Sequence, residues 1–415
     1  MSTPYFIYEP IEEVERLEDY KPGGYHPILI GDRLHDGRYR IVHKLGHGSF
    51  STTWLAWDQQ LTRYVALKVG TSDSDHHEYD VLSRIATGQE GHAKPLLPAI
   101  LGRFSIHGPN GTHFCLVTNP ARCSLADTEE ASNSGLYQLQ VARALAAQLA
   151  MAVEQIHDKG YVHGDLHLGN ILLHLSTGLD HLSEEQLYDT FGAPDPEPVI
   201  RLDGKPISSP NVPSHAISPI WLGEASEDIG LSDAKLLVID FGEAFRPEES
   251  RLVSQTPLTI RAPEAHFDPT TPLSFASDIW SLACTIWAIL GQRSLFDGQM
   301  ATQDDITCEQ VDVLGCLPPE WWDSWEARPS NFTYACQPVE GRSAWSWEQR
   351  FEENIQESRR DKGMATMDMK EKEALFSMMR WMLAFRPGDR PTAKQVLETP
   401  WMRDWALPEY KNLPE

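Results

Sequence analysis

Residues 163–173, HGDLHLGNILL, are the stretch that decides the fold. Asp165 and Asn170 lie five residues apart, and the apolar run Ile171-Leu172-Leu173 follows directly, which predicts a loop that leads into a buried strand. At this spacing a carboxylate can receive a hydroxyl proton while an amide oxygen holds Mg²⁺ beside the same phosphate. The stretch therefore predicts a phosphotransferase catalytic loop, although a match of this length also arises by chance.

The region before this loop has the alternating pattern of antiparallel strands. The expected strands are residues 39–45, 51–57 and 64–69, with turn-prone residues between them. The run LGHGSFS, residues 45–51, lies between the first two strands, and its glycines let backbone N–H groups approach phosphate oxygens. Hairpins also use glycine for geometry alone, so this run is weak evidence by itself.

A lysine on the third strand strengthens the prediction. Lys68 ends the run Val65-Ala66-Leu67-Lys68 and has apolar neighbours, so its ammonium needs a partner. The phosphates of a nucleotide and the carboxylate of Glu78 are suitable partners. The alternative is an edge-strand lysine with its ammonium in water. Its place in the series of motifs favours the first interpretation.

A hairpin and a long helix connect these strands to the catalytic loop. Residues 100–106 and 112–118 are predicted to pair through a turn at Asn110-Gly111. Thr118 is then expected beside the nucleotide, and residues 119–121 form a hinge whose backbone groups can read an adenine edge. The Ala- and Leu-rich residues 136–157 predict a core helix.

The chain after the catalytic loop carries two long insertions. Residues 176–233 are rich in Pro, Asp and Glu, so we expect a surface excursion with local turns. Asp240-Phe241-Gly242 follows a predicted strand at residues 235–239, and its carboxylate suits a metal ligand. Residues 297–370 are the second excursion, and we expect its tryptophans to pack on a helical domain rather than to bind a ligand.

Two further features predict buried structure. Glu264, in Ala262-Pro263-Glu264, is expected to form a structural ion pair with Arg390. Residues 280–290 are almost wholly apolar, but this run is too short to span a bilayer and predicts a buried helix. No secretion signal is visible at the N-terminus.

The composition limits the partners. The 415 residues include 35 Lys and Arg against 60 Asp and Glu, a formal net charge of −25. This charge disfavours direct nucleic-acid binding and membranes rich in anionic lipid. A basic polypeptide is the more natural partner, although an acidic surface also serves solubility alone. The six cysteines are scattered, so we expect neither a zinc site nor a disulfide framework, and a reducing compartment fits.

The ordered series of motifs resembles the eukaryotic protein kinases over residues 39–402. Within that superfamily the chain is similar to the SR-protein kinases, because of GGYH at 23–26, IGD at 30–32, LGHGSFSTTWLAWD at 45–58, HFCLV at 113–117 and the insertion before Asp240. The resemblance implies an α+β fold of two lobes: an N-lobe at 39–121 and a helical C-lobe at 122–402. Residues 1–38 are then an N-terminal extension and 403–415 a tail.

The same resemblance implies a site and a reaction. Asp165 would orient the substrate hydroxyl, Asn170 and Asp240 would bind Mg²⁺, and Lys68 would hold the phosphates of ATP with Glu78 positioning it. The remaining ATP-binding positions implied are Leu45, Gly46, His47, Gly48, Ser49, Phe50, Ser51, Thr53, Ala66, Thr118, Asn119, Ala121 and Leu172. The reaction implied is transfer of the γ-phosphoryl group to Ser or Thr hydroxyls of proteins, with Ser in Arg-rich tracts as the expected substrate.

Several positions depart from the family pattern. Gly164 stands where many kinases have an Arg that binds a phosphorylated activation loop, so we expect activity without loop phosphorylation. His167 replaces a Lys, which predicts a low or pH-dependent rate. Thr53 and Ser51 replace a Val and a Gly, and the short interval from Lys68 to Glu78 predicts a truncated helix.

Two other classes of function stay open on the sequence. HGDLHLGN also resembles small-molecule phosphotransferases of the aminoglycoside-kinase type, although these typically lack counterparts of Glu264, Asp278 and Arg390. A pseudokinase scaffold that binds nucleotide without turnover is the other alternative, and His167 motivates it. Residence in the cytoplasm, the nucleus or both is expected, and the sequence does not indicate an oligomeric state.

Overall fold

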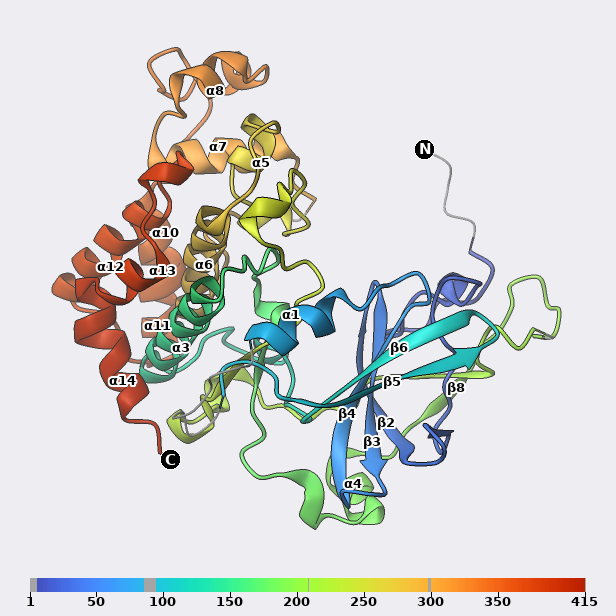
Figure 1. Ribbon diagram of the computed structural model, residues 1–415. Helices are drawn as coiled ribbons and strands as arrows, with labels where there is room; N and C mark the ends of the chain where they lie inside the picture. Colours follow the sequence, from blue (N-terminus) through green and yellow to red (C-terminus); the bar gives the residue numbers. More distant parts are fainter. Residues whose placement is uncertain (1–5, 86–94, 208, 298–299, 415) are drawn as a thin grey trace. The chain divides into compact units, whose positions relative to one another are not determined.

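The computed structural model describes residues 6–85, 95–207, 209–297 and 300–414. Contacts divide the chain into two compact units (Figure 1). Unit 1 comprises Met1–Ala86, Pro98–Cys123 and His174–Gly223, and unit 2 comprises Thr87–Leu97, Ser124–Leu173 and Glu224–Glu415. Unit 1 is built on an antiparallel sheet and unit 2 is mainly helical, which confirms the expected α+β class.

The sheet of unit 1 has six strands in the order β1-β2-β3-β4-β6-β5. Its strands are β1 Arg33–Leu34, β2 Tyr39–Gly48, β3 Ser51–Asp58, β4 Arg63–Gly70, β5 Ile100–Gly108 and β6 Gly111–Thr118. Ile41 of β2, Trp54 of β3 and Val65 of β4 are buried in one apolar cluster. Each belongs to the set of alternate residues that its strand directs to this face of the sheet, because side chains in a strand alternate between two faces. The predicted strands and hairpin are confirmed. β2 continues through the glycines to Gly48, so the glycine-rich run is the tip of the β2–β3 hairpin.

Most of the insertion after the catalytic loop, up to Gly223, folds as part of unit 1, and the rest belongs to unit 2. It contains α4 (Glu184–Phe191) and the paired strands β8 (Pro196–Pro198) and β9 (His215–Ile217). Leu187 of α4 packs with Val42 and Leu55 of the sheet, and the Tyr188 hydroxyl donates to the Val42 carbonyl at 2.9 Å. The expectation of a surface excursion with local turns is therefore wrong for α4, which packs on the sheet. The prolines do forbid a long helix, but they lie beyond α4, and apolar residues such as Leu187, Val199 and Ile217 are buried although others are exposed.

The N-terminal segment packs on this insertion. Residues 6–32 contain one short 3₁₀ turn, Leu17–Asp19, and otherwise consist of turns and irregular segments. Leu17, Tyr20 and Tyr25 form an apolar cluster whose other buried members are Val199, Val212 and Ala216 of the insertion. Two segments 180 residues apart in sequence therefore share one small core within unit 1.

Unit 2 is organised around two buried helices. These are α3 (Leu139–Asp158) and α6 (Phe275–Leu290), which pack on each other. The predicted core helix at the apolar run 280–290 is confirmed, because its side chains are almost all buried. The unit also has a two-stranded sheet of β7 (Ile171–Leu173) and β10 (Leu236–Val238). α1 (His77–Ile85) belongs to unit 1; the other helices of unit 2 are α2 (Leu125–Glu130), α5 (Glu264–Phe267), α7 (Gln303–Leu314), α8 (Pro319–Ser324), α9 (Arg328–Asn331), α10 (Trp347–Phe351), α11 (Ser358–Asp361), α12 (Met369–Met382), α13 (Ala393–Leu397) and α14 (Leu407–Lys411).

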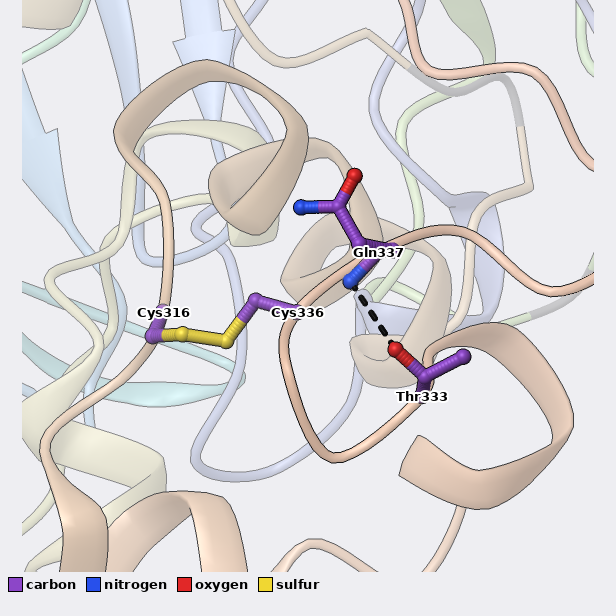
Figure 2. The surroundings of a disulfide bond; sticks show 4 residues. All are labelled: Cys316, Thr333, Cys336 and Gln337. Atoms are coloured by element: carbon purple, nitrogen blue, oxygen red, sulfur yellow. Dashed lines mark hydrogen bonds between the residues drawn. A yellow bond between two sulfur atoms is a disulfide. The ribbon is translucent and has the colours of Figure 1, made fainter.

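The second insertion contains a core of its own. Trp321, Trp322 and Trp325 are buried together with Phe332, which confirms that these tryptophans pack. Beside them a disulfide joins Cys316 and Cys336, whose Cα atoms are 5.7 Å apart (Figure 2). The expectation of no disulfide is wrong for this pair. A separation of 20 residues lies outside any short cysteine motif, and it is the folding of the insertion that brings the two cysteines together.

Within the described ranges, no helix is long and apolar enough to cross a membrane.

Candidate active site

Strand pairing in unit 2 brings two of the expected metal ligands to one end of a small sheet. Asn170 immediately precedes β7 and Asp240 follows β10 by two residues. The strands are antiparallel, with Ile171 opposite Val238, so the start of one lies beside the end of the other. The Ile239 N–H donates to the Asn170 carbonyl at 2.9 Å and continues the ladder. The amide and the carboxylate thus come from adjacent backbone positions.

Asp165 is oriented by Asn170. The Asn170 Nδ2 donates to the Asp165 carbonyl at 2.9 Å and to its Oδ2 at 3.1 Å. The other carboxylate oxygen, Oδ1, is buried and has no hydrogen-bond partner among the residues that the structure describes. A buried acceptor without a donor is costly. Asp165 Oδ1 therefore has acceptor capacity that none of the described residues uses.

A second buried carboxylate fixes the backbone of the catalytic loop. Asp278 of α6 accepts from the N–H groups of His163 at 2.7 Å and Gly164 at 3.0 Å, and it contacts His157 Nε2 at 2.9 Å. Burial alone raises the pKa of the Asp278 carboxyl, but the hydrogen bond and charge of His157 and the donated backbone N–H groups outweigh it and keep this pKa below its usual value. The loop is thus attached to a core helix through an ionised group.

Asp240 has an unusual backbone. Its φ is +63°, in the left-handed region that few non-glycine residues adopt. The next residue, Phe241, is fully buried, and its ring lies 5.0 Å from the ring of His163. His163 in turn contacts the Ile239 carbonyl through Nε2 at 3.0 Å. The aromatic residue after Asp240 is therefore locked against the catalytic loop, which fixes the carboxylate beside it.

His167 and Gly164 are the two positions in the loop that depart from the family pattern, and both lie close to other residues of unit 2. His167 Nε2 lies 3.5 Å from Asp165 Oδ2, and its Nδ1 accepts from the Gly169 N–H at 3.1 Å. Gly164 has a φ of +79°, and a Cβ there would lie 2.7 Å from the Glu243 carbonyl oxygen. Position 164 therefore requires glycine for its backbone, as well as lacking a side chain to bind phosphate.

The expected phosphate-binding residues lie together in unit 1. Lys68 of β4 forms an ion pair with Glu78 of α1, with Nζ 2.7 Å from Oε2 and 2.9 Å from Oε1. Thr53 of β3 lies opposite Lys68 in the sheet, and Ala66 lies opposite Thr118 of β6. The expected truncation of α1 cannot be followed to its end, because residues 86–94 lie outside the described residues.

The remaining predicted nucleotide positions fall on a hairpin, a hinge and a strand. Residues 45–51 form the β2–β3 tip, where Phe50 is 68% exposed. Asn119 follows β6, and its Oδ1 accepts from Arg63 at 2.6 Å, while Ala121 is partly buried. Leu172, in unit 2, is the partly buried middle residue of β7.

Sequence reasoning missed contacts that support the site. Tyr25, quoted only as part of GGYH, donates to the glycine-rich tip, and His157 contacts Asp278 from a helix taken as core alone. A tyrosine after two glycines was the available signal for the first, and a histidine in an Ala- and Leu-rich helix for the second. The predicted Arg390–Glu264 ion pair is confirmed, with two contacts of 2.7 Å.

The donor set of unit 2 suits magnesium. Mg²⁺ in phosphoryl-transfer sites is usually held by one or two protein oxygen ligands together with substrate phosphates and water. Asn170 and Asp240 supply that number of oxygens, so these residues fit the ion. The described residues contain no group of three or more His, Cys, Asp or Glu side chains arranged for a metal.

Comparison with known proteins identifies the class. A model of the protein kinase domain matches residues 39–183 and 227–402. The chain therefore belongs to the protein kinase family, whose members use ATP, typically with Mg²⁺, and act on proteins.

The relatives narrow this class to a serine/threonine protein kinase that resembles the SR-protein kinase group. The serine/threonine-protein kinase SRPK of Physarum polycephalum is 27% identical over 417 residues, covering 94% of this chain and 92% of the relative. Protein kinase dsk1 of Schizosaccharomyces pombe is 36% identical over 166 residues, covering 38% of this chain and 30% of the relative. Human SRSF protein kinase 3 is 36% identical over 169 residues, covering 39% and 30%.

Proposed function

We propose that this protein transfers the γ-phosphoryl group of MgATP to serine hydroxyls in basic, Arg/Ser-rich protein segments, with Asp165 as the residue that orients the hydroxyl. The observation that carries the proposal is the buried Asp165 Oδ1, which has no donor among the described residues, beside Asn170 and near Asp240 in the fold. A substrate hydroxyl is the donor that would complete it.

Each residue has a part in the proposed mechanism. Asp165 accepts the hydrogen bond of the substrate hydroxyl and takes its proton as the phosphoryl group is transferred. Lys68, oriented by Glu78, binds phosphate oxygens of ATP. Asn170 and Asp240 would hold Mg²⁺, which when bound neutralises charge on the phosphates. Catalysis then rests on positioning and charge neutralisation.

The substrate class is supported by charge and by similarity. The net charge of −25 favours basic partners, and two relatives are named serine/threonine-protein kinase SRPK and SRSF protein kinase 3. We expect Arg-Ser repeat peptides to be phosphorylated faster than acidic or proline-directed peptides. Equal rates on all three would refute the substrate class and leave the kinase activity intact.

The test of the function is transfer of labelled γ-phosphate from MgATP to an Arg-Ser repeat peptide by wild type and by Asp165→Ala. Wild type should transfer phosphate and the variant should not. Asp189→Ala, an exposed carboxylate of α4, is the matched control and should retain the wild-type rate. Transfer by Asp165→Ala at the wild-type rate would overturn the assignment of Asp165.

One observation favours a second candidate, a scaffold that binds nucleotide with little turnover. His167 Nε2 lies 3.5 Å from Asp165 Oδ2, at a position where the family pattern has a Lys, and an imidazole is a weaker partner for a phosphoryl group than a lysine ammonium. ATP binding by wild type without transfer to any peptide would support this candidate. Restored transfer in His167→Lys would then identify His167 as the cause.

A further inference from the structure

A tyrosine of the N-terminal segment contacts the glycine-rich tip. The Tyr25 hydroxyl lies 2.7 Å from the Gly48 carbonyl oxygen and 3.1 Å from that of Ser49, so its one proton is shared between two successive carbonyls. The tyrosine is only 4% exposed. The contact is therefore made by a fixed side chain and not by a mobile surface residue.

These bonds determine which way the tip presents its N–H groups. The peptide bonds of the described residues are all trans, so each carbonyl points away from the N–H of the next residue. Directing the Gly48 carbonyl to Tyr25 turns the Ser49 N–H to the opposite side. Directing the Ser49 carbonyl to Tyr25 likewise turns the Phe50 N–H to the opposite side. Backbone N–H groups at the tip of a glycine-rich loop are the donors that approach nucleotide phosphates.

The chain around Tyr25 is itself tightly specified. A Cβ at Gly24 would lie 1.8 Å from the Asp19 carbonyl oxygen, so only glycine lets the segment pass there. The Tyr25 N–H donates to that same carbonyl at 3.1 Å. Its own carbonyl accepts from Asn110 Nδ2 at 2.6 Å, at the turn between β5 and β6. Tyr25 is thus fixed from both sides of its backbone.

The insertion supports the same tyrosine. Val199, Val212 and Ala216 of the insertion lie in the apolar cluster that contains Tyr25. The Asn110 Nδ2 that contacts Tyr25 also donates to the Asn211 carbonyl at 2.8 Å. Burial of the ring between two segments leaves the hydroxyl little freedom, which favours one position for the tip.

We propose that Tyr25 is a positioning residue for nucleotide binding: its hydroxyl orients the backbone N–H groups of the glycine-rich tip toward the phosphates of ATP. The inference rests on the proposed function and adds a role for the N-terminal segment and the insertion, which together place this hydroxyl. Because Tyr25 acts through the backbone, it affects the phosphates and not the adenine or the peptide.

The test is Tyr25→Phe, with Tyr188→Phe as the matched control. Both substitutions remove a hydroxyl that donates to a carbonyl of β2, but the Tyr188 bond is to Val42, six residues before Gly48. Kd values for ATP and adenosine are measured for both variants, together with KM for ATP and for an Arg-Ser peptide. Thermal unfolding shows whether each variant is folded.

Tyr25→Phe should weaken ATP binding by about three- to tenfold, the range expected for one lost hydrogen bond. Adenosine binding and the peptide KM should be unchanged, and Tyr188→Phe should bind both nucleotides like wild type. Unchanged ATP binding in Tyr25→Phe, or equal loss of ATP and adenosine binding, would overturn the proposal alone. Wild type that binds neither would refute the proposed function, and this inference with it.

Discussion

The predicted catalytic loop of unit 2 and the Lys68–Glu78 pair of unit 1, proposed to bind phosphate, are fixed by different kinds of contact. Asp278, only 2% exposed, receives two backbone N–H groups of the loop. In unit 1 the side chains of Lys68 and Glu78 are 25% and 19% exposed, and their ion pair joins a strand to a short helix. A buried carboxylate with several donors cannot be removed without leaving all of them unpaired, whereas a partly exposed pair can turn to water.

This difference predicts how substitutions in each unit should affect stability and activity. Breaking the buried hydrogen bonds to Asp278 in unit 2 should lower both the stability of the protein and its activity. Breaking the Lys68–Glu78 pair of unit 1 should lower activity with little loss of stability. Water can replace the hydrogen bonds of a partly exposed partner, but it cannot hold the remaining side chain in the same orientation. The predictions below separate these two behaviours.

The largest effect is expected for Asp278→Ala. The N–H groups of His163 and Gly164 would be left buried without an acceptor, so we expect unfolding free energy to fall by about 3–5 kcal/mol and kcat by at least about a hundredfold. Urea unfolding and steady-state kinetics measure the two. Asp312→Ala, which breaks a partly buried ion pair with Arg342 in the second insertion, is the control and should lose stability alone. Full activity in Asp278→Ala would show that the loop does not depend on this carboxylate.

A smaller effect is expected for Glu78→Gln. The neutral amide cannot direct the Lys68 ammonium as the carboxylate does, so kcat/KM should fall by about tenfold while stability changes by less than about 1 kcal/mol. The control is Glu184→Gln, because Glu184 forms an ion pair of similar exposure with Arg40 elsewhere in unit 1. Equal losses of activity in the two variants would remove the special role of the Lys68 pair.

A pH effect should distinguish unit 1 further. Burial, and then the neighbouring His113 ring 4.9 Å away, lower the pKa of His26 from 6.5 to about 4. The unfolded chain therefore binds a proton that the folded chain does not between these values, so stability should fall as pH decreases from about 6.5 to about 4. Urea midpoints across this range should vary less in His26→Gln. An exposed-site control, His215→Gln, should follow wild type, and a His26 variant with the wild-type slope would contradict the assignment.

Local patterns made the sheet, the hairpin and the catalytic loop predictable. Strand periodicity and the spacing from Asp165 to Asn170 are short-range signals. The Arg390–Glu264 pair was predicted from the motifs around its two residues, which lie 126 residues apart in sequence. The fold of the insertion was not predictable in the same way. Its composition indicated a surface loop, and only contacts with β2, more than 100 residues away, show that Leu187 and Tyr188 are buried or bonded there.

Two other features depend on distant contacts in the same way. The Cys316–Cys336 disulfide requires the tryptophan cluster to bring two loops together. The contact of Tyr25 with Gly48 joins residues 23 apart through a hydroxyl. In both cases the sequence shows the residue type but not its partner, because the partner is set by how other segments pack.

The smallest expected effect is that of activation-loop phosphorylation on activity. Position 164 has a φ of +79° and no space for a Cβ near the Glu243 carbonyl, so no side chain from it can bind a phosphate. The activation-loop segment between Gly242 and Ala262 instead has contacts that need no phosphate. Thr256 Oγ1 donates to the Gly164 carbonyl at 2.9 Å, and Arg251 forms an ion pair with Glu243.

Because these contacts are made by unmodified side chains, phosphatase-treated enzyme should retain the kcat of untreated enzyme, and an upstream kinase should not raise it. Turnover of an Arg-Ser peptide before and after each treatment, with mass spectrometry of the segment, measures this. An inert dephosphorylated enzyme that regains turnover on rephosphorylation would show that Thr256 and Arg251 do not suffice. The segment would then depend on a charged partner, as Lys68 of unit 1 depends on Glu78. It would not be held by unmodified groups alone, as the backbone around Asp278 is.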